Sequence, residues 1–165
     1  MEVDNVKKQI YEFIKTLIIS VIIAFFITRI ISPVVIYGES MVPTFYHGER
    51  YFVNKLAYVN KSPERNDIVV FTCDKYGNKY LIKRVIAVAG DVVAIKNNEL
   101  YVNNKKLNEP YINGPMITPD IDEIVLKDDE IFVMGDNRNN SSDSRHFGVI
   151  MKDDIVGKLI LKNTK

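Results

Sequence analysis

The chain has little of what a disulfide-bonded protein or a metalloprotein needs. Cys73 is the only cysteine among 165 residues, which excludes an intramolecular disulfide and a multi-cysteine zinc site. We expect Cys73 to be a small residue within a strand. The two histidines, His47 and His146, are far apart in the sequence and lack the clustering that a metal site normally needs.

The chain also lacks an excess of charge of either sign. It carries 22 basic and 21 acidic residues, spread along its length, for a net charge of +1. This balance gives no long-range field that would attract nucleic acid or an acidic substrate, so a nucleic-acid partner is not expected. The 47% content of hydrophobic residues predicts one compact domain with an appendage.

One stretch near the N-terminus has no charge at all. Thirteen residues, TLIISVIIAFFIT, separate Lys15 from Arg29. If these two cations reach towards the interfaces, the apolar span is long enough to cross about 30 Å of hydrocarbon. We interpret residues 13–32 as a transmembrane anchor helix that ends between Thr28 and Pro33, because proline cannot continue the helical hydrogen bonds.

Two alternatives to an anchor stay open. A cleavable signal peptide would place small residues just after the apolar run, where TRIISPVVIYG has bulky ones. A buried core helix would show a polar face, whereas this stretch is apolar all round. Because Lys7, Lys8 and Lys15 precede the span, we expect residues 1–12 in the cytoplasm and residues 33–165 on the outer side of the membrane.

The rest of the chain predicts antiparallel β-structure. The apolar runs in residues 67–74 and 79–91 flank the turn KYGN, as in a hairpin. Shorter runs follow, with asparagine pairs at 97–98 and 103–104 that tolerate the positive φ of tight turns. We predict a mainly β fold, a compact all-β sandwich or barrel of coiled antiparallel sheets, with a small hairpin subdomain at about 93–124.

One predicted strand, LIKRVIAV, carries two cations among apolar residues. In an extended strand Lys83 and Arg84 point to opposite faces, and each is otherwise surrounded by hydrocarbon. An arginine stays charged and needs an acidic partner, but a desolvated lysine can lose its proton. Lys83 is therefore a candidate neutral amine, the alternative being a lysine on an edge strand whose amine reaches solvent.

Two polar segments complete the set of candidate functional features. Ser40 directly follows the apolar run VVIYGE and is followed by a proline turn. The segment GDNRNNSSDSRHFG, residues 135–148, follows a predicted strand. It is either a surface loop with local hydrogen bonds or an internal network whose charges brace a site.

Three motifs behind an N-terminal anchor resemble those of the bacterial type I signal peptidases: SMVPT with Ser40, KRVIAVAGD with Lys83, and GDNRNNSSDSR after a strand. The resemblance implies a serine endopeptidase of the bacterial cell membrane that removes signal peptides from exported precursors. Cleavage would follow small residues in an Ala-x-Ala-like pattern and would need no metal or cofactor. The implied partners are signal-peptide-bearing preproteins and membrane lipid.

The same resemblance assigns roles to individual residues. Ser40 is implied to be the nucleophile, which forms an acyl-enzyme, and Lys83 the general base. The implied supporting residues are a serine that orients the lysine and two ion pairs: Ser141, Asp143 with Arg145, and Arg84 with Asp136. The residues implied to lie near the pockets for small substrate side chains are Ile36, Met41, Leu81 and Ile82.

The proposed chemistry depends on the protonation state of Lys83. A lysine with the ordinary pKa of about 10.4 is less than about 1% neutral at pH 8, so burial must lower the pKa of the base. One position departs from many relatives: Gly38 stands where they have a serine that helps to bind the oxyanion. The Ser40 N–H remains as one donor, and the second donor is unassigned.

Other interpretations remain open. His47 or His146 could be the base of a serine-histidine peptidase. The chain could also be a membrane-tethered β-domain that binds extracytoplasmic partners without catalysis. A third alternative is a serine-lysine peptidase that cleaves its own chain, like the repressor-type peptidases. Those proteins carry a DNA-binding segment where this chain has its apolar span. The aromatic residues that could contact the membrane or the core are Phe45, Tyr46, Tyr51 and Phe52.

Overall fold

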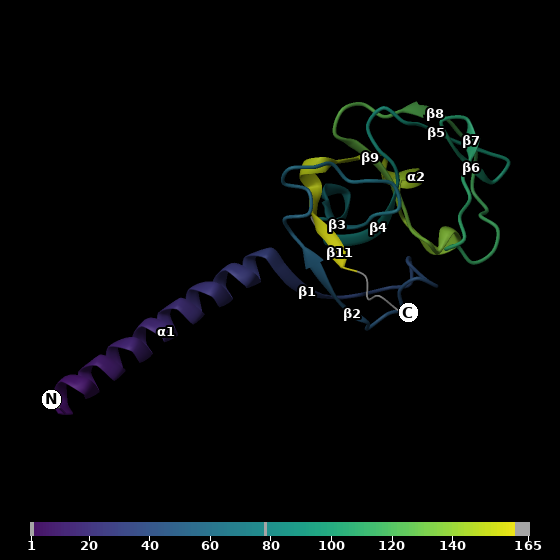
Figure 1. Cartoon of the computed structure of the whole chain (residues 1–165). Coiled ribbons are helices and arrows are strands. Elements are labelled where there is room, and N and C mark those ends of the chain that lie inside the picture. The colour runs from purple at the N-terminus through teal and green to yellow at the C-terminus, as the bar shows by residue number, and fades with distance from the viewer. Residues whose placement is uncertain (1, 78, 161–165) are drawn as a thin grey trace.

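The computed structural model describes residues 2–77 and 79–160, which form one long helix followed by two antiparallel β-sheets (Figure 1). In Figure 1, α1 (Glu2–Ile30) extends away from the β-domain. The larger sheet has seven strands, in the spatial order β1 (Ile31–Val35), β2 (Arg50–Asn54), β11 (Ile155–Ile160), β3 (Ile68–Cys73), β4 (Lys79–Ala87), β9 (Glu130–Met134) and β10 (Ile150–Met151). The predicted mainly β fold is confirmed.

The four remaining strands form a smaller sheet at one end of the β-domain (Figure 1). Their spatial order is β7 (Lys105–Lys106), β6 (Glu99–Val102), β5 (Val92–Lys96) and β8 (Ile121–Val125). The asparagines at 97, 98, 103 and 104 have φ of 54°, 64°, 53° and 61°, which confirms the positive φ predicted for these turns. Because these four strands pair only with one another in the described part of the chain, residues 92–125 contain a sheet separate from the larger one.

The helix is longer than the apolar span that the sequence marks. It begins at Glu2 rather than near residue 13 and ends at Ile30, where β1 follows without an intervening residue. No glycine or proline occurs before Pro33, so nothing interrupts the helical hydrogen bonds in the polar first turns. Residues Asn5–Ile30 are long and apolar enough to cross a membrane, and they are not buried against the rest of the chain, which contradicts a buried core helix.

The first strand explains how the chain leaves the helix. β1 pairs with β2 alone and is the edge of the larger sheet, a place where Pro33 can lie within a strand despite its missing N–H. The Ile30 carbonyl accepts the N–H of Lys55 at 2.9 Å. The last residue of α1 is thus hydrogen-bonded to Lys55, just after β2, and the next residue already belongs to β1, which pairs with β2.

The strand that carries Lys83 lies inside the larger sheet. β4 pairs with β3 and with β9, and Lys83 is opposite Val69 on β3. Two of the three cations of β4 are buried, Lys83 with 3% and Arg84 with 8% of their surface exposed, whereas Lys79 at the start of the strand is exposed. Lys83 is therefore not an edge-strand lysine, and Arg84 has the acidic partner, Asp136, that a buried arginine was expected to need.

Apolar clusters fill the space on both faces of the sheet. One contains Phe71, Val85 and Val133, and another contains Ile36, Met41 and Val70. The aromatic residues between 45 and 52 divide between core and surface: Phe45 is 2% exposed and packs against Tyr51, whereas Tyr46 and Phe52 are more than half exposed. Cys73 is partly exposed in β3, as a strand residue.

The polar segment 135–148 is an ordered part of the β-domain rather than a surface loop. It contains a short 3₁₀ helix, Arg138–Asn140, and one α-helical turn, α2 (Ser144–Phe147). The Asp143 carboxylate caps α2 by accepting the N–H of Arg145 at 3.3 Å. Two further 3₁₀ turns lie at Asp74–Tyr76 and Lys152–Asp154.

Candidate active site

Ser40 lies in a turn that two buried side chains hold in place. Ile36 before it and Met41 after it are 3% and 2% exposed, and both pack into the same apolar cluster. The Phe45 N–H donates to the Met41 carbonyl at 2.9 Å, which closes the turn. Ser40 itself is half-buried, so its hydroxyl is presented at the surface of a rigid segment.

Lys83 reaches Ser40 from β4. Its Nζ lies 2.8 Å from Ser40 Oγ and 3.0 Å from the Ile82 carbonyl oxygen. Burial lowers the pKa of Lys83 to about 8, although the negative charges of Asp143 and Asp136 act in the opposite direction. The two atoms are close enough for the hydroxyl proton to pass to the nitrogen once the amine is neutral.

A groove of about 350 Å³ opens at this pair. Its lining includes Ser40, Lys83 and the four residues expected near substrate pockets, Ile36, Met41, Leu81 and Ile82. A smaller hollow of about 140 Å³ shares Pro33, Val34, Val70 and Tyr80 with the groove, towards the end of α1. The serine and the lysine therefore meet within a mainly apolar recess that could hold an extended peptide.

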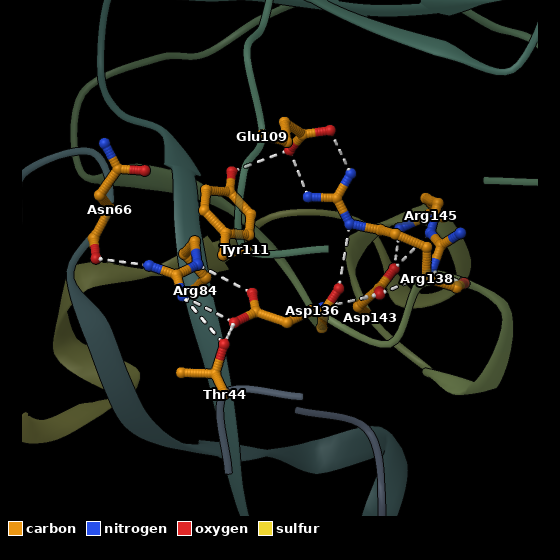
Figure 2. A network of polar contacts seen from close by, with 10 residues as sticks. Thr44, Asn66, Arg84, Glu109, Tyr111, Asp136, Arg138, Asp143 and Arg145 are labelled. Carbon is orange, nitrogen blue, oxygen red and sulfur yellow. Dashed lines mark hydrogen bonds and ion pairs between the residues drawn. The ribbon is translucent and has the colours of Figure 1, made fainter. Parts of the chain in front are cut away.

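Arg84, the residue next to Lys83, forms a buried ion pair with Asp136 (Figure 2). Its Nε and Nη2 donate to the two carboxylate oxygens at 2.8 Å and 2.6 Å. Thr44 also donates to Asp136, from the turn that carries Ser40. This ion pair joins β4, the Ser40 turn and the start of the 135–148 segment.

The second ion pair lies within the 135–148 segment. Asp143 accepts from Nε and Nη2 of Arg145, each at 2.8 Å, and from the Gly135 N–H at 3.0 Å. Burial by itself would raise the pKa of Asp143, but these donors outweigh it and hold the pKa below its usual value. Asp143 therefore stays charged and fixes the start of the segment.

Ser141 lies close to the site without contacting Lys83 by a hydrogen bond. Its Oγ is buried and makes no hydrogen bond of normal geometry among residues 2–77 and 79–160, but it lies near enough to Asp143 to help lower the pKa of that carboxylate. The space around it is tight: a Cβ added to Gly135 would lie 2.2 Å from Ser141 Oγ and 2.4 Å from the Ser40 carbonyl oxygen. Gly135 thus allows Ser141 and the Ser40 backbone to approach the same point.

Gly38 contributes through its backbone alone. Its φ of +85° is a conformation that glycine adopts without strain, and its N–H donates to His47 Nδ1 at 3.2 Å. Neither His47 nor His146 makes a hydrogen bond to Ser40 in the part of the chain that the structure describes. The pair at the groove is a serine with a lysine.

Several contacts at the site were not predicted from the sequence. Asn137 donates its N–H to the Ser40 carbonyl at 3.0 Å and its side-chain amide to the Glu39 carbonyl at 3.1 Å. Glu109 and Tyr111 approach from the smaller sheet and contact Arg138 and Arg84 (Figure 2). In the sequence, NEPYI resembles an ordinary polar loop, and no local pattern indicates these distant partners.

The carboxylates of the site are paired with arginines rather than grouped. Within the described residues, no set of three or more His, Cys, Asp or Glu side chains could hold a metal ion.

Comparisons with known proteins cover most of the chain. The family model described as "Signal peptidase, peptidase S26" matches residues 10–162. The chain is 39% identical to signal peptidase I S of Bacillus subtilis (strain 168), over 95% of this chain and 91% of that protein. It is 41% identical to signal peptidase IB of Staphylococcus aureus (strain COL), over 93% of this chain and 88% of that protein. The crystal structure of a signal peptidase I from Enterococcus faecalis V583 matches with a TM-score of 0.53 at 29% identity, over 61% of this chain and 98% of that one.

Proposed function

This chain belongs to the signal peptidase family, peptidase S26, and from that premise we propose that Ser40 and Lys83 are its catalytic pair. Members of the family are serine peptidases, so the chain is a peptidase that cleaves signal peptides. The observation that carries the assignment is the 2.8 Å contact between Ser40 Oγ and the buried amine of Lys83, at the end of an apolar groove.

In the proposed reaction, neutral Lys83 takes the proton of Ser40 as Oγ attacks the carbonyl carbon of the scissile peptide bond. The Ser40 N–H stabilises the negative charge that develops on the carbonyl oxygen. When the carbon–nitrogen bond breaks, the Lys83 ammonium returns the proton to the leaving amine. Lys83 then deprotonates a water molecule, which hydrolyses the ester and restores the Ser40 hydroxyl.

We assign supporting roles to the residues around this pair. Burial keeps Lys83 neutral near its lowered pKa, and the two ion pairs, Arg84 with Asp136 and Asp143 with Arg145, fix the backbone on both sides of it. The buried Oγ of Ser141, which lies between Asp143 and the Ser40 backbone, would accept a hydrogen bond from the Lys83 ammonium that forms during the reaction.

The groove supports a preference for small side chains before the cut. Leu81 and Ile82 line it partly buried, and Ile36 and Met41 line it with only 3% and 2% of their surface exposed. A large side chain there would have to displace packed core residues, which is costly. An Ala-x-Ala-like precursor is therefore the expected substrate, and leucine in place of the alanine before the cut is expected to abolish cleavage.

The test is cleavage of such a precursor by the detergent-solubilised full chain. Wild type should release the mature protein, whereas Ser40→Ala and Lys83→Met should not. Ser62→Ala and Lys79→Met are matched controls, because both side chains are exposed and Lys79 lies on the same strand as Lys83. Undiminished cleavage by either active-site variant would refute the assignment.

The same assay separates this function from its rivals. A serine-histidine peptidase would lose all cleavage with His47→Ala or His146→Ala, and neither is expected here. A tethered β-domain that only binds would show no turnover in wild type, and it has no use for a buried amine at a serine hydroxyl.

We also propose that α1 crosses the bacterial cell membrane with its N-terminus in the cytoplasm, next to membrane lipid. The length and composition of Asn5–Ile30 and the lysines before this segment support that orientation. In a Cys73→Ser background, a membrane-impermeant maleimide added to intact cells should label Asp122→Cys and not Lys8→Cys. The reverse labelling pattern would overturn the orientation.

A further inference from the structure

The smaller sheet sends one segment into the charged network beside the active site (Figure 2). Between β7 and β8, Glu109 forms a bidentate ion pair with Arg138, one arm of which measures 2.6 Å from Nη1 to Oε2. The Tyr111 hydroxyl donates to the same carboxylate at 2.8 Å. The Tyr111 ring lies over the Arg84 guanidinium, with 3.9 Å between Cζ and the ring centroid.

We propose that Glu109 and Tyr111 are positioning residues for the Ser40–Lys83 pair, which they hold in register through Arg138 and Arg84. This inference rests on the proposed function and names two residues that its mechanism does not include. Neither side chain lines the groove or contacts Ser40 or Lys83, so both act through their arginine partners.

The first route runs from Glu109 through Arg138 to Gly135. Arg138 Nε donates to the Gly135 carbonyl at 3.0 Å, and Arg145 Nη2 donates to the Arg138 carbonyl at 2.7 Å. Gly135 is the residue that lies against the Ser40 carbonyl and Ser141. The side chains of Arg138 and Glu109 are 2% and 8% exposed, so water cannot replace either partner cheaply. The Glu109–Arg138 ion pair therefore holds Gly135 in its position against the Ser40 carbonyl.

The second route runs from Tyr111 through Arg84 to the neighbours of Lys83 and Ser40. The ring covers one face of the Arg84 guanidinium, whose edge is bound to Asp136. Asp136 in turn accepts from Thr44, in the turn that carries Ser40. Burial raises the pKa of Tyr111, so its hydroxyl stays a donor to Glu109 at every pH at which the enzyme is expected to work. Without the ring, water would reach the ion pair that aligns β4 with that turn.

The smaller sheet provides a matched control for this arrangement. Glu99 accepts from the hydroxyl of Tyr101, two residues later, and pairs with Lys106, as Glu109 does with Tyr111 and Arg138. This second set is exposed, with 61% of the Lys106 side chain and 41% of the Glu99 side chain accessible. It is also a glutamate with a tyrosine and a cation in the same sheet region, but among the described residues it makes no hydrogen bond or ion pair with the 135–148 segment.

The experiment measures kcat and KM of the full chain in detergent with one precursor. Glu109→Gln and Tyr111→Leu are expected to lower kcat about 10- to 100-fold, with KM within about twofold, because misalignment slows the reaction without changing the groove. Tyr111→Phe keeps the ring and should retain kcat within about threefold. Glu99→Gln and Tyr101→Leu should match wild type.

Rates are divided by the folded fraction, measured by circular dichroism at the assay temperature. If Glu109→Gln does not fold, Glu109→Asp keeps the charge and should still lower kcat, because the shorter side chain cannot reach Arg138 in the same geometry. Lower melting temperatures with unchanged kcat per folded molecule would show a structural role only and overturn the proposal, as would a rise in KM alone. If Ser40→Ala cleaves the precursor like wild type, the proposed function is refuted. If Ser40→Ala is inactive but the Glu109 and Tyr111 variants match wild type, the positioning role is refuted and the proposed function stands.

Discussion

The N–H of Asn137 donates to the carbonyl oxygen of Ser40 at 3.0 Å, a backbone–backbone hydrogen bond that joins the 135–148 segment to Ser40. The neighbouring residue Gly135 lies against the same carbonyl. A backbone contact leaves no side chain that could rotate away, so any displacement of the segment moves Ser40 as well. Residues almost a hundred positions later in the chain therefore help to set the position of the Ser40 backbone.

Replacing Gly135 with alanine should disable the site. The added methyl group would lie 2.2 Å from Ser141 Oγ and 2.4 Å from the Ser40 carbonyl oxygen, and the second of these is backbone. We expect kcat to fall by about 100-fold or more, since a shift of about 1 Å costs a rate factor of this size. Gly77→Asn is the control, because asparagine accepts the φ of +66° in an open turn. Wild-type kcat in Gly135→Ala would contradict the described packing.

The rate should depend on pH through Lys83. Only the neutral amine can accept the Ser40 proton, and burial lowers its pKa to about 8, so kcat/KM should rise about tenfold per pH unit below that value and level off above it. The charge of Asp143 raises this pKa, so Asp143→Asn should move the rising limb to lower pH. A rate profile from about pH 6 to about pH 10 measures both. A limb near pH 10 would mean that Lys83 is not desolvated.

Replacing Lys83 with methionine should stabilise the folded protein at neutral pH. The folded-state pKa of about 8 lies below the reference value of 10.5, so the folded state binds the proton less well than the unfolded chain. The cost is fully present below pH 8 and disappears as pH rises to about 10.5. We expect Lys83→Met to gain about 1–3 kcal/mol at pH 7, a gain that fades in alkaline solution.

Urea unfolding at several pH values measures this gain. Lys79→Met, on the exposed end of the same strand, serves as the control and should leave the stability unchanged. A loss of stability in Lys83→Met at neutral pH would show that the amine is charged and well paired in the folded state.

Breaking the Arg84–Asp136 pair should cost more stability than removing both partners. The Asp136 side chain is fully buried and that of Arg84 is 10% exposed, so Asp136→Ala leaves a buried charge and should cost about 3–5 kcal/mol. The double variant Arg84→Met with Asp136→Leu should recover most of that loss and still cleave poorly. Glu123→Gln, in an exposed pair with Lys96, should change stability by less than about 0.5 kcal/mol. Equal losses in the single and double variants would contradict a buried pair.

Local patterns predicted the parts of the fold that depend on near neighbours. The apolar runs in residues 67–74 and 79–91 and the asparagine pairs correctly indicated strands and tight turns. Apolar composition indicated the membrane span but not where the helix begins, because α1 continues through polar residues back to Glu2. The helical turn α2 was not predicted, although its capping residue, Asp143, and its terminating residue, Gly148, are both signals in the sequence.

The candidate site was predictable as far as its motifs extend. Ser40 and Lys83 are 43 positions apart, and only the resemblance paired them before the structure placed their side chains in contact. The partners of Arg138 and Arg84 in the smaller sheet could not be predicted, because an acidic residue and a tyrosine in a loop have no periodicity that indicates a distant arginine. Such contacts depend on how two sheets pack, which no local pattern encodes.

α1 continues into β1 without a linker, and the Lys55 N–H holds the last helical carbonyl. If α1 is the membrane anchor proposed above, this direct connection sets the distance between the bilayer and the proposed catalytic pair. With α1 across a bilayer, as proposed, Ser40 would stand at one height above it, and only a peptide bond that emerges at that height would be cut. The cleaved bond would then be selected by its distance from the bilayer as well as by the side chains before it. Inserting a few flexible residues between α1 and β1 would move the cleavage position along the precursor.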